Sequence, residues 1–157
     1  MIASALLFCL LQAGVPRSSA PENALTVVAH YSVERGHVLR MTVLNDGTAA
    51  VDINEVWLPW GHVYSTLLVA IRPTDPFTGS RPLERTIVMA NPVGTSLTLR
   101  PGQTMSGDID LDRQFADLAK ALVHSDILLF WSYAPIYTGG RVGERAGGWV
   151  QLPQENR

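Results

Sequence analysis

The feature that most constrains the fold is an alternation of apolar and polar residues with a period of two, repeated between turn residues. Residues 25–33, "LTVVAHYSV", place apolar or aromatic side chains at the odd positions, with Val28 as the apolar exception on the other face. Residues 104–112 alternate in the same way, with Asp108, Asp110 and Asp112 among the polar positions. A period of two predicts strands with one buried face.

Turn residues separate the strands. Asn45–Thr48, "NDGT", predicts a tight hairpin, and Arg100–Gln103, "RPGQ", predicts a second tight turn. Residues 65–73, "STLLVAIRP", predict a strand buried on both faces, and residues 83–90, "LERTIVMA", predict another strand. The chain shows no internal repeat and no β-α-β order. We therefore expect an all-β protein, an antiparallel immunoglobulin-like β-sandwich of about eight strands.

One short helix is expected within this series of strands. Apolar residues repeat at i, i+3, i+4 and i+7 from Phe115 to Leu122, which predicts an amphipathic helix near residues 113–122. Asp112 stands at the N-cap position, where its carboxylate can accept a backbone N–H of the first turn.

The three aspartates could be taken for a metal site. Residues two apart on a strand are separated by roughly 6.6 Å, so Asp108 and Asp112 would lie roughly 13 Å apart. A calcium ion needs its oxygen ligands within about 2.3–2.6 Å of itself. We therefore expect no metal site, and interpret the aspartates as a solvated strand face followed by a helix cap.

Residues 1–20 are predicted to be a signal peptide. The apolar run from Ile2 to Leu11 is shorter than the roughly 20 residues that span a bilayer. It matches the roughly 7–15 residues of a signal-peptide core, and Ser18–Ala20 offers small residues for cleavage. No Lys or Arg precedes the run and Pro21 follows the predicted cut, so the cleavage point stays open. The alternative is an N-terminal strand or helix buried in the domain.

The exported form would be periplasmic or extracellular in a bacterium, with one β-sandwich domain at residues 21–152 and a polar tail at 153–157. The single cysteine, Cys9, lies in the predicted signal peptide, so disulfides and thiolate chemistry are not expected. The net charge of -2 and the lack of a Lys/Arg cluster argue against nucleic-acid binding. No integral membrane segment is expected after signal removal, and the oligomeric state is left open.

The best binding candidates lie in an aromatic cluster, "VWLPWGHVY", at residues 56–64. Its Pro and Gly predict a segment that leaves the sheet, where Trp60, His62 and Tyr64 could form a platform for a glycan ring or a partner's side chain. The alternative is that the tryptophans plug an open end of the core, with Trp57 the more buried and Trp60 the more exposed. A glycine-rich loop at residues 139–148 adds two further candidates, Arg141 and Arg145.

No catalytic or cofactor site is predicted. His30 falls on the polar face of its strand and His37 on the apolar side of the next, which disfavours a metal site shared by the two. The chain has no H-E-x-x-H spacing and no G-x-S-x-G elbow. The glycine-rich loop lacks the G-x-x-x-x-G-K pattern of a phosphate loop.

Two stretches together resemble a known group of domains. They are "TSLTLRPGQTMSGDIDLDRQFADL…DILLFWSYAP" and "MTVLNDGTAAVDI". The first has a strand, an "L-x-PG-[EQ]" turn, a strand ending in "DL", a short helix and a returning strand. This order resembles bacterial immunoglobulin-like β-sandwich domains, including the domain that precedes the catalytic part of deuterolysin-type metallopeptidases. A looser resemblance is to small bacterial proteinase-inhibitor domains. The resemblance implies the sandwich fold and export, and the missing H-E-x-x-H helix puts peptidase activity in doubt.

We expect an exported, non-catalytic binding or accessory protein that recognises a protein or a glycan. One alternative is a peptidase inhibitor or a pro-domain-like partner of a secreted protease, in which residues 74–82, "TDPFTGSRP", would occupy a protease cleft. The other alternative is an enzyme whose site the sequence does not reveal, since fold alone does not exclude function.

Overall fold

A computed structural model describes residues 24–34, 36–73, 82–86 and 93–155. The strands of this part are β1 (Leu25–Ser32), β2 (Val38–Asn45), β3 (Val51–Asn54), β4 (Thr66–Ile71), β5 (Ser96–Leu99), β6 (Thr104–Asp110), β7 (Ile127–Tyr133) and β8 (Ala146–Leu152). The helices are a 3-10 turn (Glu55–Trp57), α1 (Leu111–Gln114) and α2 (Leu118–Leu122). The predicted signal peptide and most of the "TDPFTGSRP" segment lie outside the described residues.

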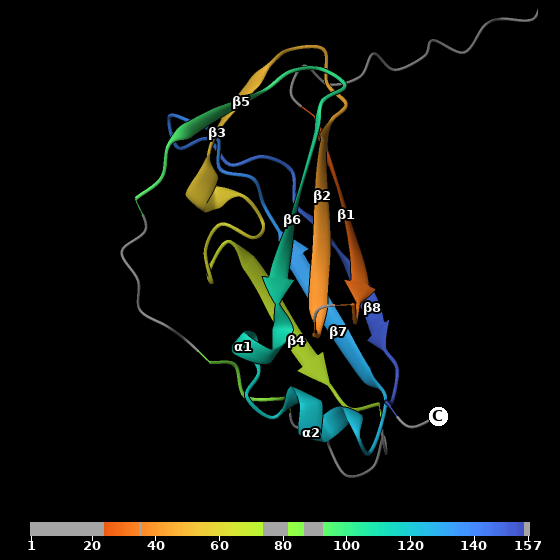
Figure 1. Cartoon of the computed structure of the whole chain (residues 1–157). Coiled ribbons are helices and arrows are strands. Elements are labelled where there is room, and N and C mark those ends of the chain that lie inside the picture. Colours follow the sequence, from red (N-terminus) through yellow and green to blue (C-terminus); the bar gives the residue numbers. More distant parts are fainter. Residues whose placement is uncertain (1–23, 35, 74–81, 87–92, 156–157) are drawn as a thin grey trace, which may run out of the picture.

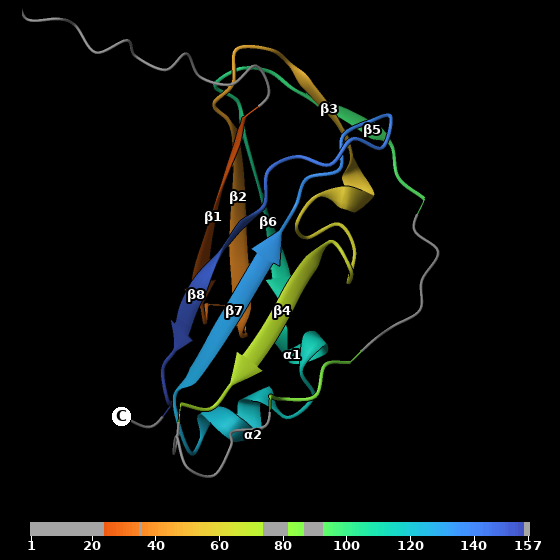
Figure 2. The same ribbon diagram turned by 180° about the vertical axis from the view of Figure 1, so that it is seen from behind.

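Two three-stranded sheets form the layers of the molecule (Figures 1 and 2). One sheet has the order β1-β2-β6 and the other the order β4-β7-β8, and every pairing between the named strands is antiparallel. The two-stranded β3-β5 sheet covers one end, and α1 and α2 lie at the opposite end. The prediction of an all-β antiparallel sandwich is therefore confirmed.

The two long edges of the sandwich differ. On one side, β1 runs alongside β8, so the outer strands of the two sheets close that edge (Figure 2). On the other side, the edge strands are β4 and β6. The described stretch 82–86 is tied there, because Leu83 N–H donates to Ala70 of β4 and Thr86 N–H donates to Gln114 of α1. This second edge holds the candidate site.

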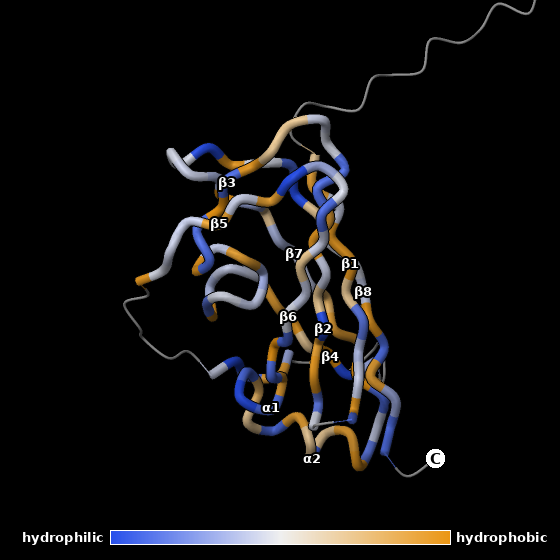
Figure 3. The backbone as a smooth tube through the Cα atoms, turned by 45° about the horizontal axis from the view of Figure 1, so that its top comes forward, coloured by the Kyte–Doolittle hydropathy of each residue, from blue (hydrophilic) through white to orange (hydrophobic). Residues whose placement is uncertain are grey.

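The core divides into two clusters. The larger lies between the three-stranded sheets and includes Leu39, Leu129 and Trp131, with residues of α1 and α2 closing its end. The smaller lies toward the β3-β5 sheet and includes Val43 and Ile53. Hydrophobic residues recur along the strands of both sheets (Figure 3), as the period of two requires when one face of a strand is buried.

Several details differ from the sequence-based expectations. The helical segment is two short helices, not one, because Phe115 leaves the helical conformation between them. The N-cap is Asp110, not Asp112, since the strand ends two residues earlier than the alternation indicates and Asp110 accepts from Arg113 N–H. No strand covers residues 83–86, and residues 87–90 of that expected strand lie outside the described part.

The strand β4 is not buried on both faces. Leu67 is 49% exposed, and on the same outer sheet surface Trp149 of β8 is 59% exposed and packs against Phe130 of β7. A continuous apolar run cannot reveal which face is covered, because burial depends on what packs there rather than on the strand itself.

Among the described residues, no helix combines the length and the apolar composition that a membrane span requires.

The predicted hairpin at Asn45–Thr48 is a crossover between sheets. β2 pairs with β1 and β6, whereas the next strand, β3, pairs with β5. Asn45 is fully buried, and its side-chain amide donates to the carbonyls of Ala49 at 2.9 Å and Leu99 at 2.8 Å. Its side-chain oxygen accepts the N–H of Gly47 at 3.0 Å. This one side chain therefore joins the end of β2 to the start of β3 and to the end of β5.

Asn45→Ala should lower the free energy of unfolding by about 2–4 kcal/mol, because it leaves buried carbonyl and N–H groups without partners. Urea unfolding followed by circular dichroism measures the loss. The matched control is Asn54→Ala, which removes a half-buried amide that bonds Gly94 and caps the 3-10 turn, at a cost of about 1 kcal/mol. Equal losses in the two variants would contradict the role of Asn45.

Candidate functional site

The aromatic segment folds as a compact loop between β3 and β4. Asn54 caps the 3-10 turn by accepting Val56 N–H, and Gly61 N–H then donates to the carbonyl of Leu58. At Gly61 a Cβ atom would lie 2.1 Å from the carbonyl oxygen of Glu55, so the backbone passes where only glycine fits. The predicted departure from the sheet at this Pro- and Gly-containing segment is confirmed.

Trp60 lies flat against the β1-β2-β6 sheet. A Cβ added to Gly107 of β6 would sit 2.3 Å from the indole ring, so the missing side chain of Gly107 makes the space that Trp60 fills. The ring is half-buried and packs against both core clusters. Trp57 is also half-buried and packs only against the smaller cluster, so the expected contrast between a buried Trp57 and an exposed Trp60 is not seen.

A pocket of about 400 Å³ lies beside this loop at the β4/β6 edge. Its lining comes from the loop, β4, β6, α1 and the described stretch 82–86, and comprises Pro59, Trp60, Gly61, His62, Val63, Thr66, Arg85, Thr86, Asp108, Ile109, Asp110, Arg113 and Gln114. A volume of this size falls in the range of about 300–1,000 Å³ that is usual for small-ligand sites. The mixture of an indole, aliphatic side chains and charged groups makes it the best candidate site of the described part.

Arg85 ties three parts of the pocket together. Its Nε donates to the side-chain oxygen of Gln114 at 3.0 Å, and its Nη2 donates to the carbonyls of Val63 and, at 3.2 Å, Thr66. All these acceptors are neutral. Partial burial lowers the pKa of Arg85. In the described part, no carboxylate bonds the guanidinium, so no ion pair offsets the effect of burial.

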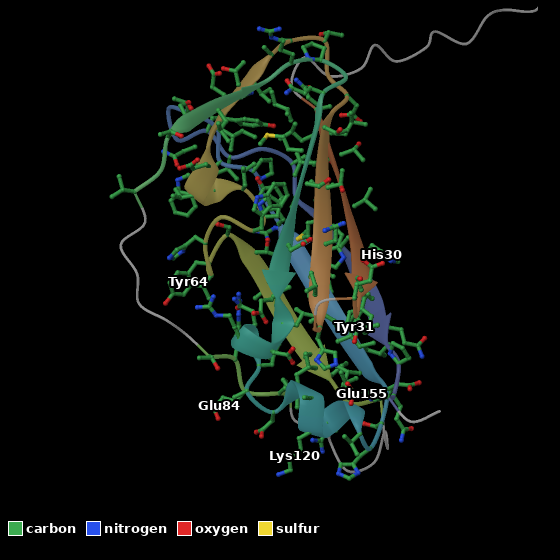
Figure 4. All side chains as sticks on the ribbon, viewed as in Figure 1. His30, Tyr31, Tyr64, Glu84, Lys120 and Glu155 are labelled. Carbon is green, nitrogen blue, oxygen red and sulfur yellow. The ribbon has the colours of Figure 1, made fainter. Side chains whose placement is uncertain are left out.

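His62 and Tyr64 contact each other near the end of the loop. The His62 Nδ1 accepts the N–H of Tyr64 at 3.3 Å, so the neutral ring carries its proton on Nε2. That Nε2 is buried and has no hydrogen-bond partner in the described part of the chain. The Tyr64 ring lies 5.2 Å from the His62 ring, is 52% exposed, and points away from the sheets (Figure 4).

Each of the three aspartates on the 104–112 stretch has its own interaction. Asp108 accepts two hydrogen bonds from the Arg40 guanidinium across the β2-β6 pair, at 2.8 and 2.9 Å. Asp110 caps α1. Asp112 pairs with His37, at 2.7 Å between Oδ1 and Nδ1. Asp108 lies in β6, Asp110 ends that strand and Asp112 lies in α1, so each carboxylate has a different partner.

His37 is held between two carboxylates. Its Nδ1 bonds Asp112, and its Nε2 bonds Glu155 at 2.9 Å, so part of the predicted polar tail folds back onto the domain. Tyr31 stacks parallel to the imidazole at 6.3 Å between ring centres, at the end of the sandwich where Glu155 also lies (Figure 4). Burial, and then the charges of Glu155 and Asp112, raise the pKa of Tyr31 to about 12.

The same contacts set the chemistry of His37. Burial lowers its pKa, but the hydrogen bonds to Asp112 and Glu155 outweigh burial, and the pKa is raised above its usual value of about 6.5. Both ring nitrogens are already engaged, whereas a general base needs one nitrogen free for substrate. The two carboxylates approach opposite edges of the ring, so they do not converge on one metal ion. His37 therefore acts as a structural ion-pair centre.

The two arginines of the glycine-rich loop lie elsewhere. Arg141 stacks over the Tyr137 ring at 4.6 Å, and Arg145 donates to the Ser132 hydroxyl at 3.0 Å. Neither lines the pocket beside Trp60. The structure thus brings Trp60 and His62 into one pocket, places Tyr64 next to them in the loop, and separates both arginines from it.

Sequence reasoning missed Arg85 and Arg113 as pocket residues. The pattern around Arg85 predicts a strand, and nothing local marks an arginine that bonds a loop residue 22 positions earlier in the chain. Arg113 was interpreted as the solvent face of a helix. The one available signal was that a strand carrying glycine, Gly107, leaves room for a large side chain from elsewhere.

Comparisons with known proteins do not assign a family. No protein-family model and no curated protein matches the sequence. A search of solved structures finds similarity to the crystal structure of a Bordetella pertussis protein assigned as ApaA. The TM-score is 0.40 and the sequence identity 12%, over 85% of this chain and 94% of the other. Similarity at this level supports no argument about function.

Stability should fall as the pH rises through the folded-state pKa of His37. Because that pKa is raised, folding favours the protonated ring, and its contribution is complete below about pH 6.5 and lost above the folded pKa. Urea unfolding between pH 5 and pH 9 measures this. His37→Gln should remove that part of the pH dependence, and His30→Gln, which removes an exposed histidine of β1, should keep it. An unchanged profile in His37→Gln would refute the assignment.

Gly107→Ala should displace the Trp60 ring, because the added methyl would overlap the indole. The overpacking should cost about 1–3 kcal/mol in unfolding free energy and make Trp60 more accessible to acrylamide quenching. Gly148→Ala is the matched control, since its Cβ would meet its nearest neighbour, Trp131, at an ordinary 3.4 Å. If both variants unfold and quench alike, the Trp60–Gly107 contact does not position the loop.

Proposed function

We propose that this chain is an exported, non-catalytic binding domain that recognises a protein partner through the pocket beside Trp60. The observation that carries the proposal is the pocket itself, a concavity of about 400 Å³ at the edge of the sandwich where β4 and β6 leave space between the sheets. The rigid indole of Trp60 and the arginines Arg85 and Arg113 meet there. Aromatic residues and arginine are enriched at protein-recognition sites.

A peptide segment fits this site better than a sugar ring. A glycan platform needs an open aromatic face, but the Trp60 indole is half-buried, with one face covered by β6 at Gly107 and contacts to both core clusters. The exposed ring nearby, Tyr64, is tilted by 44° against His62 and does not line the pocket. The remaining lining groups offer charged donors and acceptors, which match the amides and side chains of a peptide.

The position of the pocket supports a protein partner in a second way. Thr66 of β4 lines it, and β4 is an edge strand whose outer side is bonded by the described stretch 82–86 at Ala70, through Leu83 N–H, and at Thr66, through Arg85. Edge strands have unpaired backbone groups that an extended peptide can bond. A partner segment could therefore enter the pocket with a side chain or a terminus and keep its backbone near the edge.

The proposal is tested by panning a random peptide library against the purified chain and measuring the affinity of enriched peptides by fluorescence anisotropy. Thr86→Trp fills the mouth of the pocket from an exposed position, and we expect it to weaken binding at least about tenfold, a change of about 1.4 kcal/mol. Thr104→Trp, at an exposed position of β6 outside the pocket lining, is the matched control and should bind normally. Failure to enrich any peptide, or equal binding to the blocked variant, would refute the proposed function.

A further inference from the structure

The pocket contains a cation whose hydrogen-bond partners among the described residues are all neutral. Arg85 uses Nε and Nη2 on three neutral oxygens, and its Nη1 donates no hydrogen bond in the described part of the chain. Of the described side-chain atoms that have no hydrogen bond, only His62 Nε2 and Ser125 Oγ are sealed from solvent, so Nη1 keeps solvent contact. One end of a half-buried guanidinium therefore stays open to solvent beside the pocket.

The acidic residues of the lining are already engaged. Asp108 is bound by the Arg40 guanidinium, and Asp110 accepts the backbone N–H at the start of α1. The described lining holds two arginines, Arg85 and Arg113, and these two aspartates, so its formal charges balance. Arg85 nevertheless bonds only neutral oxygens, and a carboxylate on a ligand would give its guanidinium a charged partner.

The lining holds a second polar atom without a partner. The Nε2–H of His62 is a donor with no acceptor in the described part. His62 lines the same pocket, but its Nε2 is sealed from solvent. The contact with a ligand oxygen is therefore assigned to Arg85.

We propose that the pocket is a carboxylate-binding site, in which Arg85 Nη1 donates to the carboxylate and the Trp60 indole contacts the apolar part attached to it. The proposal rests on the proposed function and names its ligand chemistry: the partner contributes a carboxylate, from a chain terminus or from an acidic side chain. Arginine suits this task because its guanidinium stays charged when half-buried and can keep its other donors on the protein.

Three capped probes test the chemistry and separate its sources. They are N-acetyl-alanyl-alanine as the free acid, the same dipeptide as its C-terminal amide, and N-acetyl-aspartate N-methylamide. Titrations are followed by the Arg85 side-chain Nε signal and the tryptophan indole signals in ¹H–¹⁵N spectra. Binding of the free acid alone identifies a C-terminal carboxylate, and binding of the aspartate probe identifies an acidic side chain. Either result supports the proposal, and an amide that binds as well as both carboxylates overturns it.

Inorganic phosphate is the further probe, because it tests the charge argument. A carboxylate should bind more tightly than phosphate, since Asp108 and Asp110 in the same lining disfavour a second negative charge. Tighter binding of phosphate would overturn the choice of a carboxylate.

Substitutions assign the contact to Arg85. Arg85→Lys keeps the charge but loses the Nη1 donors, and we expect carboxylate affinity to fall at least about tenfold, the factor that one hydrogen bond to a charged group supplies. Arg100→Lys, at an exposed site away from the pocket, is the matched control and should leave affinity unchanged. If Arg85→Lys does not fold, Thr86→Trp blocks the mouth without removing the guanidinium and should abolish the shifts. Unchanged carboxylate binding in the folded Arg85→Lys or in Thr86→Trp overturns the proposal.

The two proposals can fail separately. Peptides that are blocked by Thr86→Trp but bind equally as acid and amide would keep the pocket as a protein-binding site and reject the carboxylate. Carboxylate probes that bind at Arg85 while no peptide is enriched would keep the anion chemistry and reject the protein partner.

Discussion

The fold depends on a buried amide at the point where the chain leaves one sheet for another. Asn45 closes the β2 strand, bonds the carbonyls of Ala49 and Leu99, and accepts the N–H of Gly47. Its own backbone groups bond Gln103 and Gly102. A buried amide fully satisfied in this way is rigid, because breaking any one bond leaves a buried polar group unpaired. The β3-β5 sheet is thereby attached to the main sandwich, and the loop that follows β3 starts from a fixed point.

The loop that lines the pocket is placed where two glycines lack a side chain. The missing side chain of Gly107 lets the Trp60 indole lie against β6. The missing side chain of Gly61 lets the loop turn close to the 3-10 backbone. Arg85 then fastens the loop to α1 through neutral oxygens. On the other side, β1 and β8 pack against each other, and the pocket near their ends is lined by residues of β1 and of the glycine-rich loop rather than by this aromatic loop.

The sequence predicted what depends on local periodicity and missed what depends on distant partners. The β1-β2 hairpin follows from alternation alone, and so does the inward register of His37, which is 8% exposed. The two ion pairs of His37 do not follow from local periodicity. Asp112 lies 75 residues and Glu155 lies 118 residues further along the chain. Turn chemistry predicted a turn at Asn45 but not its topology, since the same residues serve a hairpin or a crossover. Arg85 had no local signal, because its acceptors are carbonyls and an amide that any sequence could provide.

The distribution of charge explains why the aspartate-rich strand and the pocket belong together. Asp108, Asp110 and Asp112 look like a ligand set in the sequence, yet each is committed to a guanidinium, a helix start or an imidazole. A carboxylate already bound to the protein has little capacity left for a cation. Arg85 presents the opposite case, since its bonds to neutral oxygens hold its geometry without neutralising its charge. The aspartates of this stretch are therefore engaged within the domain, whereas the Arg85 guanidinium at the neighbouring edge has only neutral described partners.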